Sequence, residues 1–255
     1  MDRMRILAVD VGNTSVFFAE ISDNKIVKTY RISALKTDSG HVAQNLRRRF
    51  ALKGIDAVVI ASVVPMLGAK LRRDLPRILG IRTLLIGKDL SVPIQNRYRN
   101  PKQVGTDRLV NAYAAYRKHR KACVIIDFGT AITLDAVSSK GEYLGGVIAP
   151  GIQISLEALF QKTALLPKIR LKHTGGKLIG RDTAESIRIG CTIGIGGLCD
   201  RLAFQIKEAL GPKTVVIATG GYAAFMKRYC RSIYRVSPLL TVQGIRLAYL
   251  ESKKA

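Results

Sequence analysis

Two short segments of the chain have the residue types that bind phosphate and metal ions. In the first segment, an apolar run ends at Asp10, and a turn of Val11, Gly12, Asn13 and Thr14 follows. Small residues in a turn expose backbone N–H groups and hydroxyls to phosphate oxygens. A carboxylate at the end of a strand can hold a divalent cation directly or through water. A plain hairpin turn, in which Asp or Asn bonds to the local backbone, is the structural alternative for a single copy.

The second segment repeats this plan in the other half of the chain. Residues 123–144 align without a gap with residues 6–27. The identities are Asp10 with Asp127, Gly12 with Gly129 and Ala19 with Ala136. In both copies an apolar strand ends at an aspartate, a turn of small residues follows, and a second apolar strand runs on. We interpret the repeat as an internal duplication, and two such turns facing each other across a cleft would hold a triphosphate and its metal.

A third apolar run, at 214–221, also ends in small residues. Thr219, Gly220 and Gly221 would admit an adenosine close to the backbone. This strand end favours phosphate binding over a plain hairpin turn. The sequence has no G-x-x-x-x-G-K-[ST] motif, so ATP binding would not use a P-loop.

Asp107 is a third candidate carboxylate, at the start of a helix expected at 107–118. An acid there is stabilised by the helix dipole, and capping explains it completely. The functional alternative is a general base that orients and deprotonates a substrate hydroxyl for attack on a γ-phosphoryl group. Arg108 beside it could hold a carboxylate or a phosphate. The spacing alone favours the helix cap.

Alternating strand and helix signals surround these segments. Strands are expected at 57–64, 82–87 and 214–221, and helices at 39–53, 66–79, 107–118, 150–160, 183–210 and 241–252. Interleaved strands and helices predict an α/β architecture, with a boundary between the two halves near 117–121. The long helix from 183 carries Gly190, Gly194 and Gly197 near one face, which predicts close helix packing there, within the chain or across a dimer.

The composition is that of a globular protein with an excess of basic charge. The 255 residues are 47% hydrophobic, enough to build one large domain or two smaller ones. Lys and Arg number 42 against 18 Asp and Glu, and the net charge of +24 attracts polyanions. The basic residues form short groups beside apolar residues at helical spacing, at 46–50, 71–77, 116–121 and 226–235. This pattern favours solvated helix faces over a nucleic-acid surface, and no DNA- or RNA-binding signature accompanies it.

The cysteines and histidines lack the spacing of a zinc site. Cys123, Cys191, Cys199 and Cys230 contain no C-x-x-C pair, and the three histidines are far apart. We expect reduced, buried thiols. No stretch approaches the roughly 20 apolar residues of a membrane span, and the first apolar run is too short for a signal peptide. A cytoplasmic protein that does not bind membranes is therefore expected.

Six segments together resemble type III pantothenate kinases. They are DVGNTS at 10–15, ASVVP at 61–65, YRNPKQVGTDR at 98–108, IDFGTAITLD at 126–135, GGVIAPGI at 145–152 and IGRDTAESI at 179–187. The resemblance covers nearly the whole chain in the family's order and spacing. It implies the fold of the superfamily of actin, sugar kinases and chaperone ATPases: two duplicated ribonuclease H-like domains, expected at 1–118 and 119–255, with a nucleotide cleft between them.

The resemblance also implies roles for individual residues. The phosphate and metal site would be Asp10, Gly12, Asn13 and Thr14, with Mg²⁺ at Asp10. A monovalent cation, K⁺ or ammonium, would bind at Asp127, and Thr130 would contact ATP. The pantothenate pocket would be formed by Tyr98, Gly105, Thr106, Asp107 and Arg108, with Asp107 as the general base. Thr183 would contact substrate, from the partner subunit of a homodimer.

The implied reaction transfers the γ-phosphoryl group of ATP to the primary hydroxyl of pantothenate, the first step towards coenzyme A. The alternative is a transcriptional regulator of the Bvg accessory factor type, which would bind nucleic acid on the same fold. The charge of +24, more basic than expected of the family, leaves room for such a polyanion-binding role. Asp10, Asp107 and Asp127 favour the kinase, because a binding module needs neither a base nor two cation carboxylates. The short chain disfavours a sugar kinase.

Overall fold

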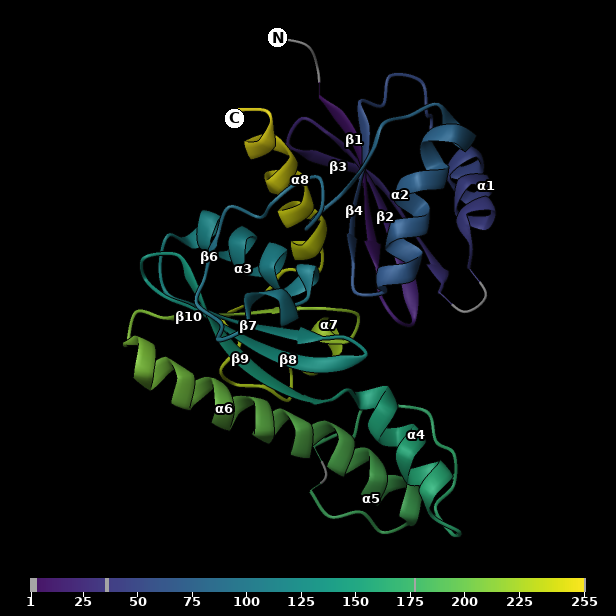
Figure 1. Ribbon diagram of the computed structural model, residues 1–255. Helices are drawn as coiled ribbons and strands as arrows, with labels where there is room; N and C mark the ends of the chain where they lie inside the picture. Colours follow the sequence, from purple (N-terminus) through teal and green to yellow (C-terminus); the bar gives the residue numbers. More distant parts are fainter. Residues whose placement is uncertain (1–3, 35–36, 177, 255) are drawn as a thin grey trace. The chain divides into compact units, whose positions relative to one another are not determined.

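The computed structural model describes residues 4–34, 37–176 and 178–254, which form two compact units (Figure 1). Unit 1 comprises the chain up to Ala114 together with the segment from Leu240, and unit 2 comprises Ala115–Leu239. Within the described residues, no helix is both long and apolar enough to span a membrane. Both units combine β-strands with α-helices, so the predicted α/β class is confirmed.

Unit 1 is built on a five-stranded sheet. The strands of this sheet are β1 (Arg5–Val11), β2 (Ser15–Ser22), β3 (Lys25–Ser33), β4 (Ala57–Ser62) and β5 (Thr83–Leu85). The short β6 (Gln95–Asn96) follows in the chain and is not part of this sheet. The helices of unit 1 are α1 (Ser39–Arg49), α2 (Pro65–Leu79), the 3₁₀ turn η1 (Pro101–Gln103), the first part of α3 (Thr106–His119) and α8 (Leu240–Ser252). The sheet order is β3-β2-β1-β4-β5; β1, β4 and β5 are parallel, and β2 is antiparallel to both of its neighbours, β1 and β3.

Unit 2 repeats this arrangement. Its strands are β7 (Cys123–Phe128), β8 (Ala131–Val137), β9 (Glu142–Pro150), β10 (Val215–Thr219) and β11 (Arg235–Val236). Its helices are α4 (Ile152–Lys162), α5 (Thr183–Ile189), the π-helical segment η2 (Gly190–Gly194), α6 (Ile195–Leu210) and α7 (Ala223–Met226). The strand order within the unit, β9-β8-β7-β10-β11, matches that of unit 1 strand for strand, with the same parallel and antiparallel pairs.

The strand registers correct one detail of the predicted repeat. The β1–β2 ladder pairs Asp10 with Phe17, whereas the β7–β8 ladder pairs Asp127 with Thr133. The gapless alignment would have paired Asp127 with Leu134, so the second turn is one residue shorter than the first. The expected match of Ala19 with Ala136 is therefore wrong. Ala19 pairs with Ala8, and Ile125, the residue equivalent to Ala8, pairs with Asp135, so Ala19 is equivalent to Asp135.

Both faces of the unit 1 sheet are covered by helices. Leu7 and Val9 of β1 belong to the core formed with α1 and α2, and α1 and α2 lie together on one side of the strands (Figure 1). Helix α8 contacts β1 and β4 and lies on the other side in Figure 1. Helix α8 also approaches α3 closely, since a Cβ on Gly244 would lie 2.2 Å from the Val110 carbonyl oxygen. The C-terminal helix α8 thus belongs to unit 1, although it lies in the expected second segment, 119–255, of the chain.

The core of unit 2 lies between its sheet and helices α4, α6 and α7. Val124, Ile126 and Phe128 of β7 pack there with Ile152 and Cys199. Alternate residues of a strand face the same side, so one row of apolar residues on β7 meets the helices.

The expected helices correspond to α1, α2, α3, α4, the nearly continuous run α5-η2-α6, and α8, and the expected strands to β4, β5 and β10. Helix α1 ends at Arg49 rather than near 53, because Phe50 is extended and a turn follows at Gly54, whose φ is +78°. The close approach expected at Gly190, Gly194 and Gly197 is wrong within the described chain, where nothing lies within 4 Å of a Cβ built on them. Gly196 is the closely packed glycine of α6: its Cβ would lie 2.2 Å from the Tyr229 carbonyl oxygen.

Candidate functional site

In unit 1, the predicted phosphate turn lies where β1 and β4 end side by side. These strands are parallel, with Asp10 paired to Ala61 and Val11 to Ser62. The turn after β1 is closed by a 2.9 Å hydrogen bond from Gly12 N to Ser15 O, and it leaves the side chains of Asn13 and Thr14 exposed. Ligands of open α/β sheets bind at the carboxyl ends of parallel strands, so this edge is a suitable place for a phosphate.

The start of helix α3 is fastened to the same edge. The Thr106 hydroxyl accepts a hydrogen bond from Ser62 N and donates one to Ser62 O, both at 3.2 Å. Gly87, whose φ is +88°, leaves room for the Thr106 methyl group. A Cβ added at position 87 would lie 3.3 Å from that methyl carbon. Thr106 therefore fixes the position of the next residue, Asp107, relative to the end of β4.

The Asp107 carboxylate folds back over the turn that precedes the helix. Its Oδ1 accepts a 2.8 Å hydrogen bond from Arg108 N and would lie only 2.5 Å from a Cβ on Gly105. Position 105 must be glycine for the carboxylate to adopt this conformation. Arg108 is buried, with 8% of its surface exposed.

Asp10 and Asp107 are close enough to interact electrostatically. Burial, and secondarily the charge of Asp107, raise the pKa of Asp10 from 3.8 to about 7, while Arg31 acts in the opposite direction. Two carboxylates near each other disfavour ionisation of both. Strongly perturbed acids in pairs are typical of functional sites, because a purely structural site gains nothing from an unfavourable charge.

Arg31 is a further cation at this turn that the sequence did not single out. Its guanidinium donates a 2.9 Å hydrogen bond to Ser15 Oγ, at the end of the turn, and lies over the Phe17 ring at 4.8 Å. An arginine beside backbone N–H groups adds to the attraction for phosphate. No local pattern marks Arg31, because its role depends on the pairing of β2 with β3.

In unit 2, the second aspartate turn has a tightly packed glycine beside it. Asp127 of β7 pairs with Thr219 of β10. A Cβ on Gly220 would lie 2.3 Å from Asp127 Oδ1 and 2.6 Å from the Phe128 carbonyl carbon, and its φ of +90° also requires glycine. The turn itself is closed by a 3.1 Å hydrogen bond from Gly129 N to Ala131 O.

Gly151, which precedes α4, is a second close contact of this turn. A Cβ there would lie 2.0 Å from the Thr130 carbonyl oxygen and 2.8 Å from that of Gly129. The turn that follows Asp127 thus brings two backbone carbonyl oxygens together next to Gly151. Gly151 lies in the segment 145–152, one of the six that resemble the kinase family, but no local pattern marks its contact with the turn.

The remaining predicted site residues lie elsewhere in their units. Tyr98 is half-buried in the segment before η1, and its backbone N–H donates to Asn96 Oδ1 at 3.0 Å. Gly221 is exposed, with nothing within 4 Å of a Cβ among the described residues. Thr183 is exposed at the start of α5, which Asp182 caps by accepting from Glu185 N at 2.7 Å.

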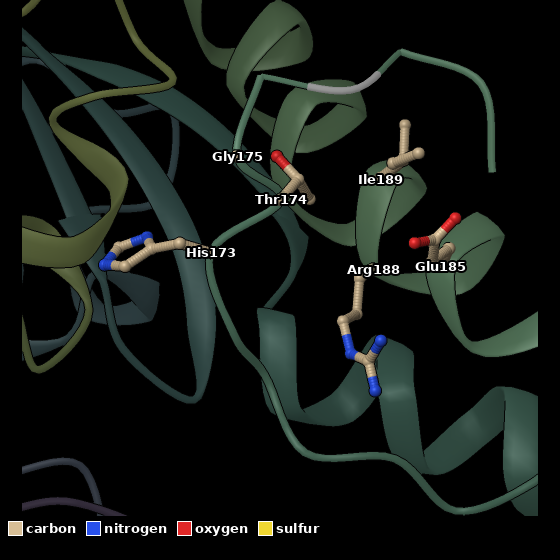
Figure 2. Close-up of a pocket in the computed structure, with 6 residues that line it drawn as sticks. All are labelled: His173, Thr174, Gly175, Glu185, Arg188 and Ile189. Carbon is tan, nitrogen blue, oxygen red and sulfur yellow. The ribbon is translucent and has the colours of Figure 1, made fainter.

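A cavity of about 240 Å³ opens beside α5, lined by His173, Thr174, Gly175, Glu185, Arg188 and Ile189 (Figure 2). The His173 ring points away from Glu185 and Arg188 and stacks on Phe225, with ring centroids 4.3 Å apart. None of the six was a predicted site residue.

The cysteines are all buried, as expected, and burial raises the pKa of Cys123 to about 12. Such thiols are poor nucleophiles and metal ligands. Among the described residues there is no group of three or more His, Cys, Asp or Glu side chains arranged to hold a metal ion.

Comparison with known proteins decides the family. A family model described as type III pantothenate kinase matches residues 6–205. The type III pantothenate kinase of Myxococcus xanthus is 38% identical over 96% of this chain and 97% of its own length. That of Geobacter sulfurreducens is also 38% identical, over 98% of this chain and all of its own. The chain belongs to the type III pantothenate kinase family.

This family membership confirms the resemblance drawn from the six sequence segments. Among solved structures, a Baf-family protein from Campylobacter jejuni, named as a candidate transcriptional activator, is similar with a TM-score of 0.62. The two chains are 20% identical over 98% of this chain and all of the other, so the likeness is one of fold. Within unit 1, the structure brings together Asp10, the 12–14 turn, Thr106 and Asp107. Within unit 2, it brings together Asp127, Thr219 and Gly220, and Thr130 lies in the turn that follows Asp127.

Proposed function

We propose that this chain transfers the γ-phosphoryl group of ATP to the primary hydroxyl of pantothenate, giving 4'-phosphopantothenate. Family membership supports the reaction, and one observation of this chain carries the assignment of its residues. This observation is the pair of carboxylates, Asp10 and Asp107, at a strand end beside a turn of small residues. Phosphoryl transfer requires little more from a protein than positioned cations and a group that orients the attacking hydroxyl.

Asp107 is the general base in this proposal. It orients the pantothenate hydroxyl and holds its proton as the oxygen attacks phosphorus. The fixed start of α3 supports this role, because Thr106 and Gly105 hold the carboxylate in one place. The expected helix cap is wrong in detail, because α3 begins at Thr106 and Asp107 lies inside its first turn, where an acid is favoured by the helix dipole. The hydrogen bond that Oδ1 accepts from Arg108 N is compatible with general base catalysis.

The turn from Val11 to Thr14 would bind the phosphates, and Asp10 would hold Mg²⁺, directly or through water. These residues fit a hard divalent cation, which prefers oxygen ligands. The pKa of Asp10 is raised to about 7 by burial and by the nearby Asp107, so a bound cation would relieve the unfavourable negative charge. When bound, Mg²⁺ neutralises charge on the transferred phosphoryl group.

In unit 2, we assign K⁺ or ammonium to Asp127, and ATP contacts to Thr130, Thr219, Gly220 and Gly221. The carbonyl oxygens of Gly129 and Thr130 near Gly151 suit a monovalent cation, which prefers oxygen ligands of low charge. Gly220 supports a close approach of the nucleotide, since it has no side chain at a crowded strand end.

Tyr98, Gly105, Thr106 and Arg108 would complete the pantothenate pocket, with Thr183 contributed by the second subunit of a homodimer. The exposed apolar side chains of α6 support a dimer, since Leu198 and Phe204 are 42% and 52% exposed. We also propose a cytoplasmic location, where ATP and Mg²⁺ are supplied.

The shared strand order of the two units supports two ribonuclease H-like domains, as in the actin-like ATPases, with the nucleotide between them. We keep 1–118 and 119–255 as the duplicated segments of the sequence. Helix α8 is then an addition after the second copy that packs on the first.

The alternative, a nucleic-acid-binding regulator, has weaker support. It rests on the charge of +24 and on the likeness in fold to the Baf-family protein at 20% identity. A regulator would need neither a perturbed carboxylate pair nor a fixed base. It would bind DNA with a steep dependence on salt concentration, which ATP binding does not require.

The test is ATP-dependent phosphorylation of pantothenate by the purified protein, with and without K⁺, beside the Asp107→Asn variant. Asn has the size of Asp and keeps an oxygen that can accept the hydrogen bond from Arg108 N. The variant should therefore fold and bind ATP normally while its kcat falls by about 10²- to 10⁴-fold. Asp38→Asn, at the N-cap of α1, is the matched control and should retain full activity. Full activity of Asp107→Asn would assign Asp107 to stabilisation of the first turn of α3 alone, and no turnover by the folded wild type would refute the kinase.

A further inference from the structure

A second cavity of unit 2 is lined by basic side chains. It has a volume of about 330 Å³ and lies where α3 ends and where β7 and β10 begin. Its lining residues are His119, Lys121, Lys207, Thr214, Val215, Val216, Ser232 and Tyr234. Three of them carry basic groups, and none of the described lining residues is acidic. The cavity is large enough for a small ligand such as a phosphate ester.

The basic groups act together on His119. Burial, and then the charges of Lys118, Arg235 and Lys121, lower its pKa. The His119 ring is therefore less protonated than a free imidazole at the same pH, and a neutral ring offers one N–H donor. Positive charges that converge on a concave surface focus the field and attract anions.

Helix α6 carries two acids, Asp200 and the exposed Glu208, which follows Lys207 in the sequence. Asp200 accepts hydrogen bonds from the backbone N–H groups of Arg231 and Ser232, at 2.9 and 2.8 Å. Asp200 also fixes the backbone of the segment that carries Ser232 into the cavity wall.

The wall of the cavity holds a hydroxyl without a partner. Ser232 Oγ is buried and makes no hydrogen bond to any of the residues that the structure describes. A buried polar group without a hydrogen bond is unfavourable, so rotation of the Ser232 side chain toward a ligand in the cavity would give its hydroxyl a partner.

The cavity is separate from the second aspartate turn. Strands β7 and β10 are parallel, and the cavity residues 121 and 214–216 lie at the N-terminal ends of these strands. Asp127 and Thr219 lie at the C-terminal ends of the same two strands. Four residues of strand at about 3.3 Å each separate the two places by about 13 Å. A ligand in the cavity does not occupy the nucleotide site proposed for this turn.

We propose that this cavity binds a small phosphate-bearing anion, either inorganic phosphate or a phosphate monoester. Lys121 and Lys207 would pair with the phosphate oxygens, the His119 ring would donate one hydrogen bond, and Ser232 Oγ would donate another. The proposal stands on the unit 2 cavity alone and does not depend on the kinase reaction.

The experiment is an NMR titration of the full-length protein that follows the three histidine rings at constant pH and ionic strength. The His119 signal is assigned with His119→Asn, and His41 and His173 serve as internal references. The probes are inorganic phosphate, glycerol 3-phosphate and a short DNA duplex. Lys121→Gln with Lys207→Gln forms the test variant, and Lys140→Gln with Lys162→Gln, both exposed in unit 2, forms the matched control with the same loss of charge.

We expect a saturable shift of the His119 signal alone, with phosphate or with the monoester; the probe that binds more tightly identifies the source of the anion. Each lysine removed should weaken binding about tenfold, the value of one charge-assisted hydrogen bond, while the control variant binds as the wild type does. A shift that does not saturate, equal weakening in both variants, or a response to the duplex alone would overturn the proposal, since each would indicate a diffuse effect of the +24 charge.

Discussion

Replacing Asp10 with Asn should stabilise the ligand-free protein, and more so as the pH rises. The folded protein keeps the Asp10 proton up to about pH 7, whereas the unfolded chain loses it near 3.8. The folded state thus binds more protons between these values, and its stability falls as the pH rises through this window. Asn resembles the protonated acid and has no proton to lose, so the variant escapes this loss.

The size of the effect follows from the two pKa values. At 1.36 kcal/mol per pH unit, ionising Asp10 in the folded state destabilises the protein by about 4 kcal/mol at pH 8. At pH 5, where the folded carboxyl is still protonated, the corresponding figure is about 1.7 kcal/mol. The stabilisation of Asp10→Asn should therefore increase by about 2.5 kcal/mol from pH 5 to pH 8. For a chain of this length, that is a change of about 5 °C in the Tm difference.

The assay is thermal unfolding of the wild type and the variant without ATP or Mg²⁺, in steps from pH 5 to pH 8. Asp38→Asn is the control with the opposite sign, because the hydrogen bond from His41 N lowers the pKa of Asp38 below 3.8. Stability from Asp38 is lost only as the pH falls through that lower value, so its Tm difference should be constant from pH 5 to pH 8.

Two results would refute this reasoning. A Tm difference for Asp10→Asn that does not change with pH would mean that Asp10 is not in a desolvated site beside Asp107. A variant less stable than the wild type at pH 8 would mean that the Asp10 carboxylate has stabilising partners in the ligand-free protein. Mg²⁺ with ATP should reverse the order, since the cation stabilises only the wild-type carboxylate.

Two further substitutions test how the site is built. Gly220→Ala should destabilise the protein by about 2–4 kcal/mol and abolish ATP binding, because its Cβ would overlap Asp127 Oδ1 at a φ of +90°. The matched control is Gly221→Ala, since no described atom lies within 4 Å of a Cβ there. Equal unfolding temperatures for the two variants would contradict the packing described at Gly220. Thr106→Val should lower kcat about tenfold in steady-state assays, because the hydrogen bonds to Ser62 that position α3 are lost. Thr106→Ser keeps the hydroxyl and should keep most of the activity. Wild-type rates for the Val variant would exclude this positioning role.

Local patterns in the sequence were sufficient for most of the elements. Apolar runs that end in Asp10 and Asp127 predicted β1 and β7, and helical periodicity predicted the long helices. These signals are local because a strand or helix needs only a few residues of matching period. The short β6, α7 and β11 were not predicted, since two to four residues carry no detectable period.

The sequence by itself thus determined the α/β class, the repeated aspartate turns, the buried thiols and the family. Only the tertiary structure decided three things: that the second turn is one residue shorter, that α8 packs with unit 1, and that Asp107 lies near enough to Asp10 to raise its pKa. Each of these depends on contacts between segments far apart in the chain. A strand register is fixed by pairing and a pKa by burial and neighbouring charge, and neither is encoded in the residues next to the site.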